Sequence, residues 1–263
     1  MRGAIIGDIC GSVYEWRNMK TERPYDIALD RADCRFTDDT VLTVATADAL
    51  LGDRNYVRAY REWGLRYGDI GYGPRFIKWL GGGGDSHSYG NGSAMRISPV
   101  GWFFGALEET LAEAERSAAA SHNHPEGIKG AQAVAAAIFW ARTGRSKKNI
   151  RQQIKQRFGY DLDRTVESIR PGYAFDATCR GSVPEAIIAF LDSRDFEHAI
   201  RLAISLGGDS DTIACVTGAI AEAFYGGVPD ALWAFAESKL PEDIRTGIDH
   251  FRAGEHRSQC VQG

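Results

Sequence analysis

The stretch LGGDSDTIACVTGAIAEAFYG, residues 206–226, places two aspartates one residue apart, directly before a long apolar and alanine-rich run. Such a run, ended by glycine at position 226, predicts a buried helix. A single aspartate would suffice as its N-terminal cap, since one side-chain oxygen can accept from the free amide groups of the first turn. The second carboxylate calls for another explanation, so Asp209 and Asp211 are candidate functional residues.

The composition is that of an ordinary soluble globular protein, with 263 residues, 44% of them hydrophobic and 25% charged. The net charge of −4 provides no basic excess for a nucleic-acid backbone. The sequence contains no run of about 18 apolar residues, the length that would predict a membrane span. The N-terminus is too short and too acidic for a signal peptide. The five cysteines match no zinc-binding spacing. We expect a cytoplasmic protein with reduced thiols and no membrane partner.

Apolar residues recur with helical spacing almost throughout, whereas the alternation typical of strands is scarce. No internal repeat or linker-like segment divides the chain. We therefore predict an all-α fold, a single compact multi-helix domain over residues 1–263 whose polar tail frays after about residue 251. The clearest predicted helices cover residues 41–51, 93–105, 125–140, 196–204 and 212–225.

Two further segments carry acids beside helix starts. RFTDDTVLTVATADALL, residues 35–51, places a threonine and two aspartates before an apolar helix, about 170 residues ahead of the opening stretch. GDICGSVYEW, residues 7–16, adds an aspartate and a glutamate among glycines. If the three segments converge, one site gathers Glu15, Asp38, Asp39, Asp209 and Asp211.

A site with five carboxylates needs a cation. Each helix N-terminus offers roughly half a positive charge, too little to offset five acids, and buried like charges are costly. Carboxylate and hydroxyl oxygens suit Mg²⁺, Mn²⁺ or Ca²⁺ rather than Zn²⁺, and such a set could hold a pair of ions. The alternative is that each acidic cluster only caps its own helix, and the residues alone leave both interpretations open.

The chain resembles the ADP-ribosylglycohydrolase family, which includes ADP-ribosyl-acceptor hydrolases and relatives of dinitrogenase reductase-activating glycohydrolase. Six segments carry the resemblance in the family's order: GAIIGDICGSVYE (3–15), FTDDTVLTVATADALL (36–51), GYGPRF (71–76), SYGNGSAMRISPVGW (88–102), SHNHPEG (121–127) and SLGGDSDTIACVTGAIAEAFYG (205–226). The resemblance implies an all-α fold with a two-metal cleft.

The resemblance also assigns site residues by position. It implies two Mg²⁺ ions, for which Mn²⁺ could substitute, held by Thr37, Asp38, Asp39, Asp209, Asp211 and Thr212. The catalytic residues it implies are Glu15, Asp38 and Asp209. The ADP-ribose contacts it implies are Gly71, Gly73, Ser88, Tyr89, Gly90, Asn91, Gly92 and His122. Whether Glu15 acts as a base, a metal ligand or both stays open.

Plainer interpretations exist at several of these positions. The glycine-rich stretch 80–96 could present backbone N–H groups to a pyrophosphate, or it could be a flexible connection. His122 and His124 could both be helix-entry residues. The resemblance favours ligand contact for His122 and leaves His124 as a cap or a structural residue. Asp8 is either an acid supporting the metal site or the acceptor of a structural hydrogen bond.

The activity implied is release of ADP-ribose from ADP-ribosylated acceptors, protein side chains above all, by cleavage at the distal ribose anomeric carbon. The alternative is a catalytically inactive ADP-ribose-binding or structural relative, which would have lost ligand carboxylates that this chain retains. A phosphohydrolase of the His-Asp type is disfavoured, because none of the six histidines is followed by aspartate.

The expected partner is an ADP-ribosylated protein or an ADP-ribose-containing small molecule, with nucleic-acid-linked ADP-ribose as another acceptor. Arginine, serine, acetyl-ester and base linkages are not distinguished. The charged, irregular segments 17–35 and 159–180 are expected to rim the cleft and set this specificity. No coiled-coil pattern occurs, and we expect a monomer.

Overall fold

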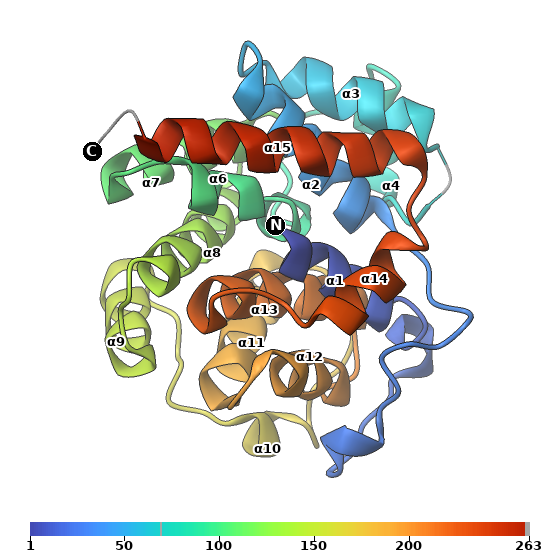
Figure 1. The fold of residues 1–263 in the computed structure, drawn as a ribbon, viewed down its shortest axis with the longest axis vertical. Helices are drawn as coiled ribbons and strands as arrows, with labels where there is room; N and C mark the ends of the chain where they lie inside the picture. The colour runs from blue at the N-terminus through green and yellow to red at the C-terminus, as the bar shows by residue number, and fades with distance from the viewer. Residues whose placement is uncertain (69, 261–263) are drawn as a thin grey trace.

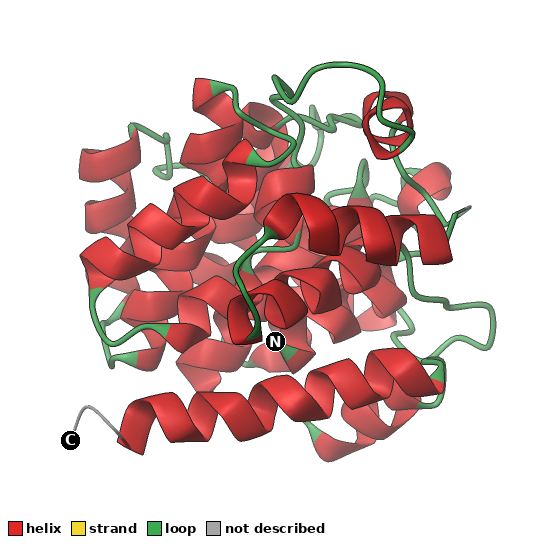
Figure 2. Cartoon of the chain, turned by 90° about the horizontal axis from the view of Figure 1, so that it is seen from above, coloured by secondary structure: helices red, strands yellow, loops and turns green. Residues whose placement is uncertain are grey.

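The computed structural model describes residues 1–68 and 70–260, without the side chains of residues 255–260. Within these residues the chain forms helices joined by loops, with no strand (Figure 2). The α-helices are α1 (Arg2–Gly11), α2 (Asp38–Leu51), α3 (Tyr56–Arg66), α4 (Pro74–Leu80), α5 (Gly92–Met95), α6 (Ser98–Phe103), α7 (Leu107–Ala119), α8 (Pro125–Arg142), α9 (Lys147–Phe158), α10 (Val166–Ile169), α11 (Cys179–Asp192), α12 (Phe196–Ser205), α13 (Ser210–Tyr225), α14 (Asp230–Glu237) and α15 (Glu242–Cys260). Two 3-10 turns, η1 (Glu15–Arg17) and η2 (Pro24–Asp26), precede α2. The predicted all-α fold is confirmed.

The helices α1 and α13 pack against each other near the centre of the molecule (Figure 1). Their backbones nearly touch: a Cβ atom built on Gly7 would lie 2.0 Å from the carbonyl oxygen of Ala214. A Cβ atom on Gly218 would lie 2.1 Å from the carbonyl oxygen of Gly3. Only glycine permits this approach. Because Gly11 in turn lies against Ser210, the two helices run antiparallel, and the end of α1 meets the start of α13.

The start of α2 is tied to α1 by a buried carboxylate. Asp8 accepts hydrogen bonds from the backbone N–H groups of Thr37 at 3.0 Å and Thr40 at 3.1 Å, and from both threonine hydroxyls. These bonds satisfy amide groups that the first turn of a helix leaves free. Asp8 therefore acts as the acceptor of structural hydrogen bonds, one of the two roles considered for it. These bonds bring the start of α2 to the place where the end of α1 meets the start of α13.

The helix boundaries differ from the prediction in two places. The helix expected over 93–105 is split into α5 and α6, since Pro99 lacks the N–H group that a continuous helix needs. At the C-terminus, α15 continues to Cys260, beyond residue 251, where we expected the tail to fray. Fully buried Ile248 and Phe251 anchor this helix, which lies across α2 and α6 (Figure 1).

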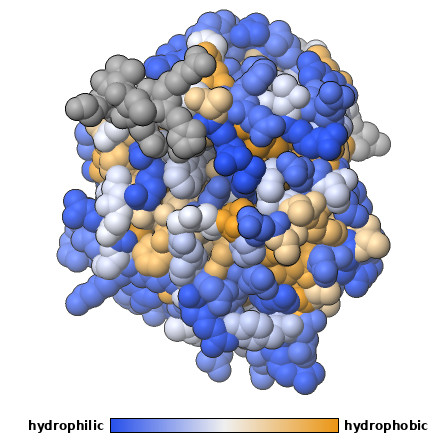
Figure 3. Space-filling model, viewed as in Figure 1, coloured by the Kyte–Doolittle hydropathy of each residue, from blue (hydrophilic) through white to orange (hydrophobic). Residues whose placement is uncertain are grey.

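Hydrophilic side chains predominate on the face shown in Figure 3, where hydrophobic ones form small separate patches. Among the helices of the described residues, none combines the length and apolar character of a membrane-spanning segment. Cys260 lies outside the described side chains, and the four other cysteines are free and buried: Cys10, Cys34, Cys179 and Cys215.

Candidate active site

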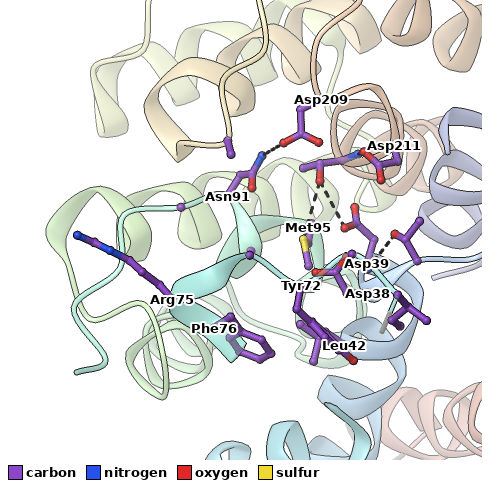
Figure 4. A pocket seen from close by; sticks show the side chains of 18 of the residues that line it. Asp38, Asp39, Leu42, Tyr72, Arg75, Phe76, Asn91, Met95, Asp209 and Asp211 are labelled. Atoms are coloured by element: carbon purple, nitrogen blue, oxygen red, sulfur yellow. Dashed lines mark hydrogen bonds between the residues drawn. The ribbon is translucent and has the colours of Figure 1, made fainter. Parts of the chain in front are cut away.

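A cleft of about 870 Å³ opens where the starts of α2 and α13 face the loop before α5 (Figure 4). Its volume lies within the range of roughly 300–1,000 Å³ that is typical of small-molecule sites. Every residue that the sequence assigned to catalysis, metal binding or ADP-ribose contact lines this cleft. The roles of these residues remain predictions, whereas their common location is a feature of the fold.

Three carboxylates come within ligand distance of a shared centre. One oxygen each from Glu15, Asp209 and Asp211 lies within 4.8 Å of the others. Asp38 and Asp39 line the same cleft from the start of α2, across from Asp209 and Asp211 (Figure 4). The three acidic segments therefore do converge, and the closest group of acids joins η1 to α13.

Capping alone does not explain the two aspartates at the start of α13. Asp209 occupies the N-cap position, yet its side chain makes no capping hydrogen bond. Instead, its Oδ2 accepts from the amide Nδ2 of Asn91 at 2.7 Å (Figure 4). Gly207 and Gly208, with φ of +75° and +70°, form the left-handed turn that leads into this position. Asp209 therefore connects the start of α13 to the glycine-rich loop.

Burial raises the pKa of all five carboxyl groups. Burial and the nearby Asp211 raise the pKa of Glu15 to about 8, and burial raises the pKa of Asp209 to about 6. The pKa values of Asp38, Asp39 and Asp211 lie well above their usual range, because each group is buried and also faces another carboxylate. Repulsion of this kind favours the binding of a cation.

The donor set fits a hard divalent cation. The Oδ2 atom of Asp39 is buried and has no hydrogen-bond partner among the described residues. The hydroxyl of Thr212 donates to Asp39 Oδ1 at 3.4 Å, and that of Thr37 donates to Asp8 Oδ1 at 2.7 Å. Carboxylate and hydroxyl oxygens are the ligands that Mg²⁺ and Mn²⁺ prefer.

The glycine-rich loop is fixed on both sides. The backbone N–H of Asn91 donates to the carbonyl of Ala177 at 2.8 Å, and that of Cys179 donates to the carbonyl of Tyr89 at 3.0 Å. On the opposite side, a Cβ atom on Gly92 would lie 3.0 Å from Nε2 of His122. These contacts tie residues 89–92 to both walls of the cleft, which favours the first of the two interpretations for this part of the stretch.

His124 caps α8, as the sequence predicted. Its ring nitrogen Nδ1 accepts a hydrogen bond from the backbone N–H of Glu126 at 3.1 Å. The neighbouring His122 is 5% exposed and lines the cleft instead. The two histidines thus separate into a helix cap and a residue of the cleft wall.

Apart from Tyr89, sequence reasoning missed the aromatic side chains of the cleft. Trp16 is 76% exposed at its mouth, and its ring stacks on Phe175 with centroids 5.7 Å apart. Tyr72 and Phe76 line the wall, with ring centroids 5.4 Å apart (Figure 4). Phe175 falls within the segment 159–180 that was expected at the rim, but nothing local in the sequence pairs it with Trp16.

The fold and the cleft can be compared with those of known proteins. A model of the ADP-ribosylglycohydrolase family matches residues 1–256. The ADP-ribosylarginine hydrolase Tri1 of Pseudomonas putida is 27% identical over 286 residues, covering 92% of this chain and 76% of Tri1. The human ADP-ribosylhydrolase ARH3 is 26% identical over 331 residues, covering 93% of this chain and 90% of ARH3.

Comparison with solved structures also finds a protein related to this family. An ADP-ribosylglycohydrolase-related protein complex superposes with a TM-score of 0.64 at 26% identity, covering 90% of this chain and 95% of that one. The chain belongs to the ADP-ribosylglycohydrolase family, and it is a hydrolase of the kind that acts on glycosidic bonds.

Proposed function

We propose that the protein is a magnesium-dependent hydrolase that releases ADP-ribose from ADP-ribosylated acceptors, protein side chains above all, by cleaving the bond at the distal ribose anomeric carbon. One observation carries the proposal: Glu15, Asp209 and Asp211 place carboxylate oxygens within 4.8 Å of one another in a cleft also lined by the glycine-rich loop. The similarity to Tri1, an ADP-ribosylarginine hydrolase, and to ARH3, an ADP-ribosylhydrolase, supports the same chemistry for this chain.

Two Mg²⁺ ions would be held by the side chains at the starts of α2 and α13, namely Thr37, Asp38, Asp39, Asp209, Asp211 and Thr212. Bound there, they would offset the repulsion among the acids and supply Lewis-acid polarisation of ribose oxygens. Mn²⁺ would substitute, because it accepts the same oxygen ligands.

The protein's own residues would orient the sugar and move the proton. Cleavage at an anomeric carbon passes through an oxocarbenium-like state, and Asp38 and Asp209 would hold negative charge beside it. Glu15 would act as general base and accept a proton from the attacking water. The water oxygen bonds to the anomeric carbon, and the bond to the acceptor nitrogen or oxygen breaks. The proton that Glu15 took from the water then passes to the departing acceptor, which restores the carboxylate.

The test is release of free ADP-ribose, measured by chromatography, from arginine-linked, serine-linked and nucleic-acid-linked substrates. Each is incubated with Mg²⁺, with a chelator, and with the Asp211→Asn variant. Asp249→Asn is the matched control, since Asp249 is exposed on α15 and does not line the cleft. Metal-dependent release that only Asp211→Asn abolishes would support the proposal and identify the linkage. ADP-ribose binding without release from any substrate would favour an inactive ADP-ribose-binding relative.

The role of Glu15 has its own test. Glu15→Gln keeps the size of the side chain and removes its basicity, so turnover should fall while Mg²⁺ affinity falls much less. Full turnover with unchanged metal affinity would remove Glu15 as the base and leave the role of the metal intact.

A further inference from the structure

A chain of buried polar groups leads from α5 to the back of His122. Arg96 directly follows α5 and is fully buried, and its Nη2 donates to the hydroxyl oxygen of Ser121 at 2.9 Å. Ser121 Oγ lies 2.8 Å from Nδ1 of His122. The other ring nitrogen, Nε2, faces the glycine-rich loop, since a Cβ atom on Gly90 would lie 3.6 Å from it. One side of the ring therefore meets Ser121, and the other meets the glycine-rich loop that lines the cleft.

The hydrogen-bond inventory decides which nitrogen carries the proton. A guanidinium is a donor only, so the Ser121 oxygen must be the acceptor in its bond with Arg96. The Ser121 hydroxyl proton then finds its acceptor in His122 Nδ1. If Nδ1 carried a proton and donated it to Ser121, this hydroxyl proton would lack an acceptor among the contacts of the described residues. A buried donor without an acceptor is costly.

The ring is also held neutral. Burial, and after it the positive charge of Arg96, lower the pKa of His122 well below its ordinary value. A neutral imidazole carries a proton on one nitrogen only. With Nδ1 accepting from Ser121, that proton resides on Nε2, at the cleft wall.

We propose that Arg96 and Ser121 are positioning residues that fix His122 as its Nε2–H tautomer, so that the ring presents a hydrogen-bond donor to an oxygen of bound ADP-ribose. The identity of the ligand rests on the proposed function, whereas the tautomer does not. Phosphate oxygens only accept hydrogen bonds. In the opposite tautomer, Nε2 would carry a lone pair instead of a proton and could not bond such an oxygen.

Stability alone does not account for the buried Arg96. None of the ion pairs among the described residues includes it, and its Nε and Nη1 atoms have no hydrogen-bond partner there. Its guanidinium lies 3.8 Å from the ring centroid of Tyr60, and its Nη2 also donates to the carbonyl of Ser117 at 3.4 Å. These contacts compensate its burial only in part. Burying a charge with so few partners costs free energy. The contact with Ser121, which positions His122, offers a functional reason for the buried charge.

The tautomer is measured by ¹⁵N NMR on ligand-free protein labelled at histidine, with the His122 signals assigned from their loss in His122→Gln. Ser121→Ala removes the donor to Nδ1. Ser117→Ala is the matched control, because Ser117 is also buried and its hydroxyl bonds the Tyr60 hydroxyl at 2.6 Å rather than Ser121 or His122. The Ser117 carbonyl, which accepts from Arg96 Nη2 at 3.4 Å, is retained in this variant. Calorimetry then gives the dissociation constant for ADP-ribose in the presence of Mg²⁺.

In the wild type, Nδ1 should resonate as the unprotonated nitrogen and Nε2 as the protonated one. In Ser121→Ala the Nδ1 atom loses its donor, so the Nδ1–H tautomer should gain population. The dissociation constant for ADP-ribose should rise about tenfold, as expected for a weakened bond to a charged group. Ser117→Ala should change neither. His122→Gln, whose amide can donate from the Nε2 position, should bind ADP-ribose more tightly than His122→Asn.

A protonated Nδ1 in the wild type would overturn the proposal, as would a Ser121→Ala variant with unchanged tautomer and affinity. Melting temperatures identify any variant that fails to fold, in which case the wild-type NMR result alone decides. Absence of ADP-ribose binding by the wild type would count against the proposed function, and the ligand-free tautomer would still decide the present inference.

Discussion

The close packing of α1 against α13 brings Glu15 beside Asp211. Replacing Gly7 with alanine tests this packing. The new Cβ atom would lie 2.0 Å from the carbonyl oxygen of Ala214 and 2.6 Å from the backbone N of Cys215. Ordinary van der Waals contact begins at 3.4 Å. Because both neighbours are backbone atoms in a buried helix, no side chain can rotate away, and the helices must separate by roughly 1 Å.

Overpacking in a core typically costs 1–3 kcal/mol, and a backbone clash of this depth belongs at the upper end, about 3 kcal/mol. For a protein of this size, that lowers the melting temperature by about 6–12 °C. The same displacement moves Glu15 relative to Asp211. A misplacement of about 1 Å can cost about 100-fold in rate, so ADP-ribose release should fall more steeply than stability.

The assay is urea unfolding followed by fluorescence, together with turnover at a temperature where the variant stays folded. Gly172→Ala is the control, because a Cβ atom there meets nothing within 4 Å. A loss of less than about 1 kcal/mol for Gly7→Ala, similar to an ordinary surface change, would refute the argument that backbone contact positions the two acids.

Three further predictions follow from the site. In a chelator, the free energy of unfolding should fall as pH rises from about 4.5 to 8, because the pKa of Glu15 is raised from 4.5 to about 8 and the folded state holds a proton that the unfolded state releases. Saturating Mg²⁺ should reduce this slope, and stability that rises with pH in urea titrations under chelation would contradict the assignment. Asp8→Ala should lower the free energy of unfolding by about 2–4 kcal/mol, because two backbone amides of α2 lose their acceptor; an unchanged urea midpoint would exclude this role. Trp16→Ala should raise KM for an ADP-ribosylated protein several-fold and leave the affinity for free ADP-ribose unchanged, because Trp16 stands exposed at the mouth of the cleft; equal effects on both ligands would place it at the ADP-ribose itself.

Local features of the fold were predictable from local sequence. Helical periodicity identified the all-α class, and His124 caps α8, one of the roles that the sequence analysis gave it. The break before α6 was missed, although Pro99 marks it, because the surrounding apolar residues continue the helical pattern. The helical course of residues 252–260 was also missed, since the anchor at Phe251 is a tertiary contact.

The site was predictable to the extent that it follows the six family segments. Their residues line one cleft, but convergence itself depends on the contact of α1 with α13, which helical spacing does not reveal. The stacking of Trp16 on Phe175 joins two irregular segments and leaves no periodic signal. The path from Arg96 through Ser121 to His122 likewise needs three-dimensional coordinates, although Ser121 and His122 are adjacent in sequence.

The contact between Gly7 and Ala214 also has a consequence for synthesis on the ribosome, because it joins residues more than 200 positions apart. At translation rates of about 5–20 residues per second, α1 emerges roughly 10–40 seconds before its partner helix exists. Through that interval α1 has no α13 to pack against, and Asp209 and Asp211 have not yet been synthesised. The cleft is therefore among the last parts of the molecule to form, and a nascent chain that stops short of α13 has an apolar N-terminal helix without its packing partner.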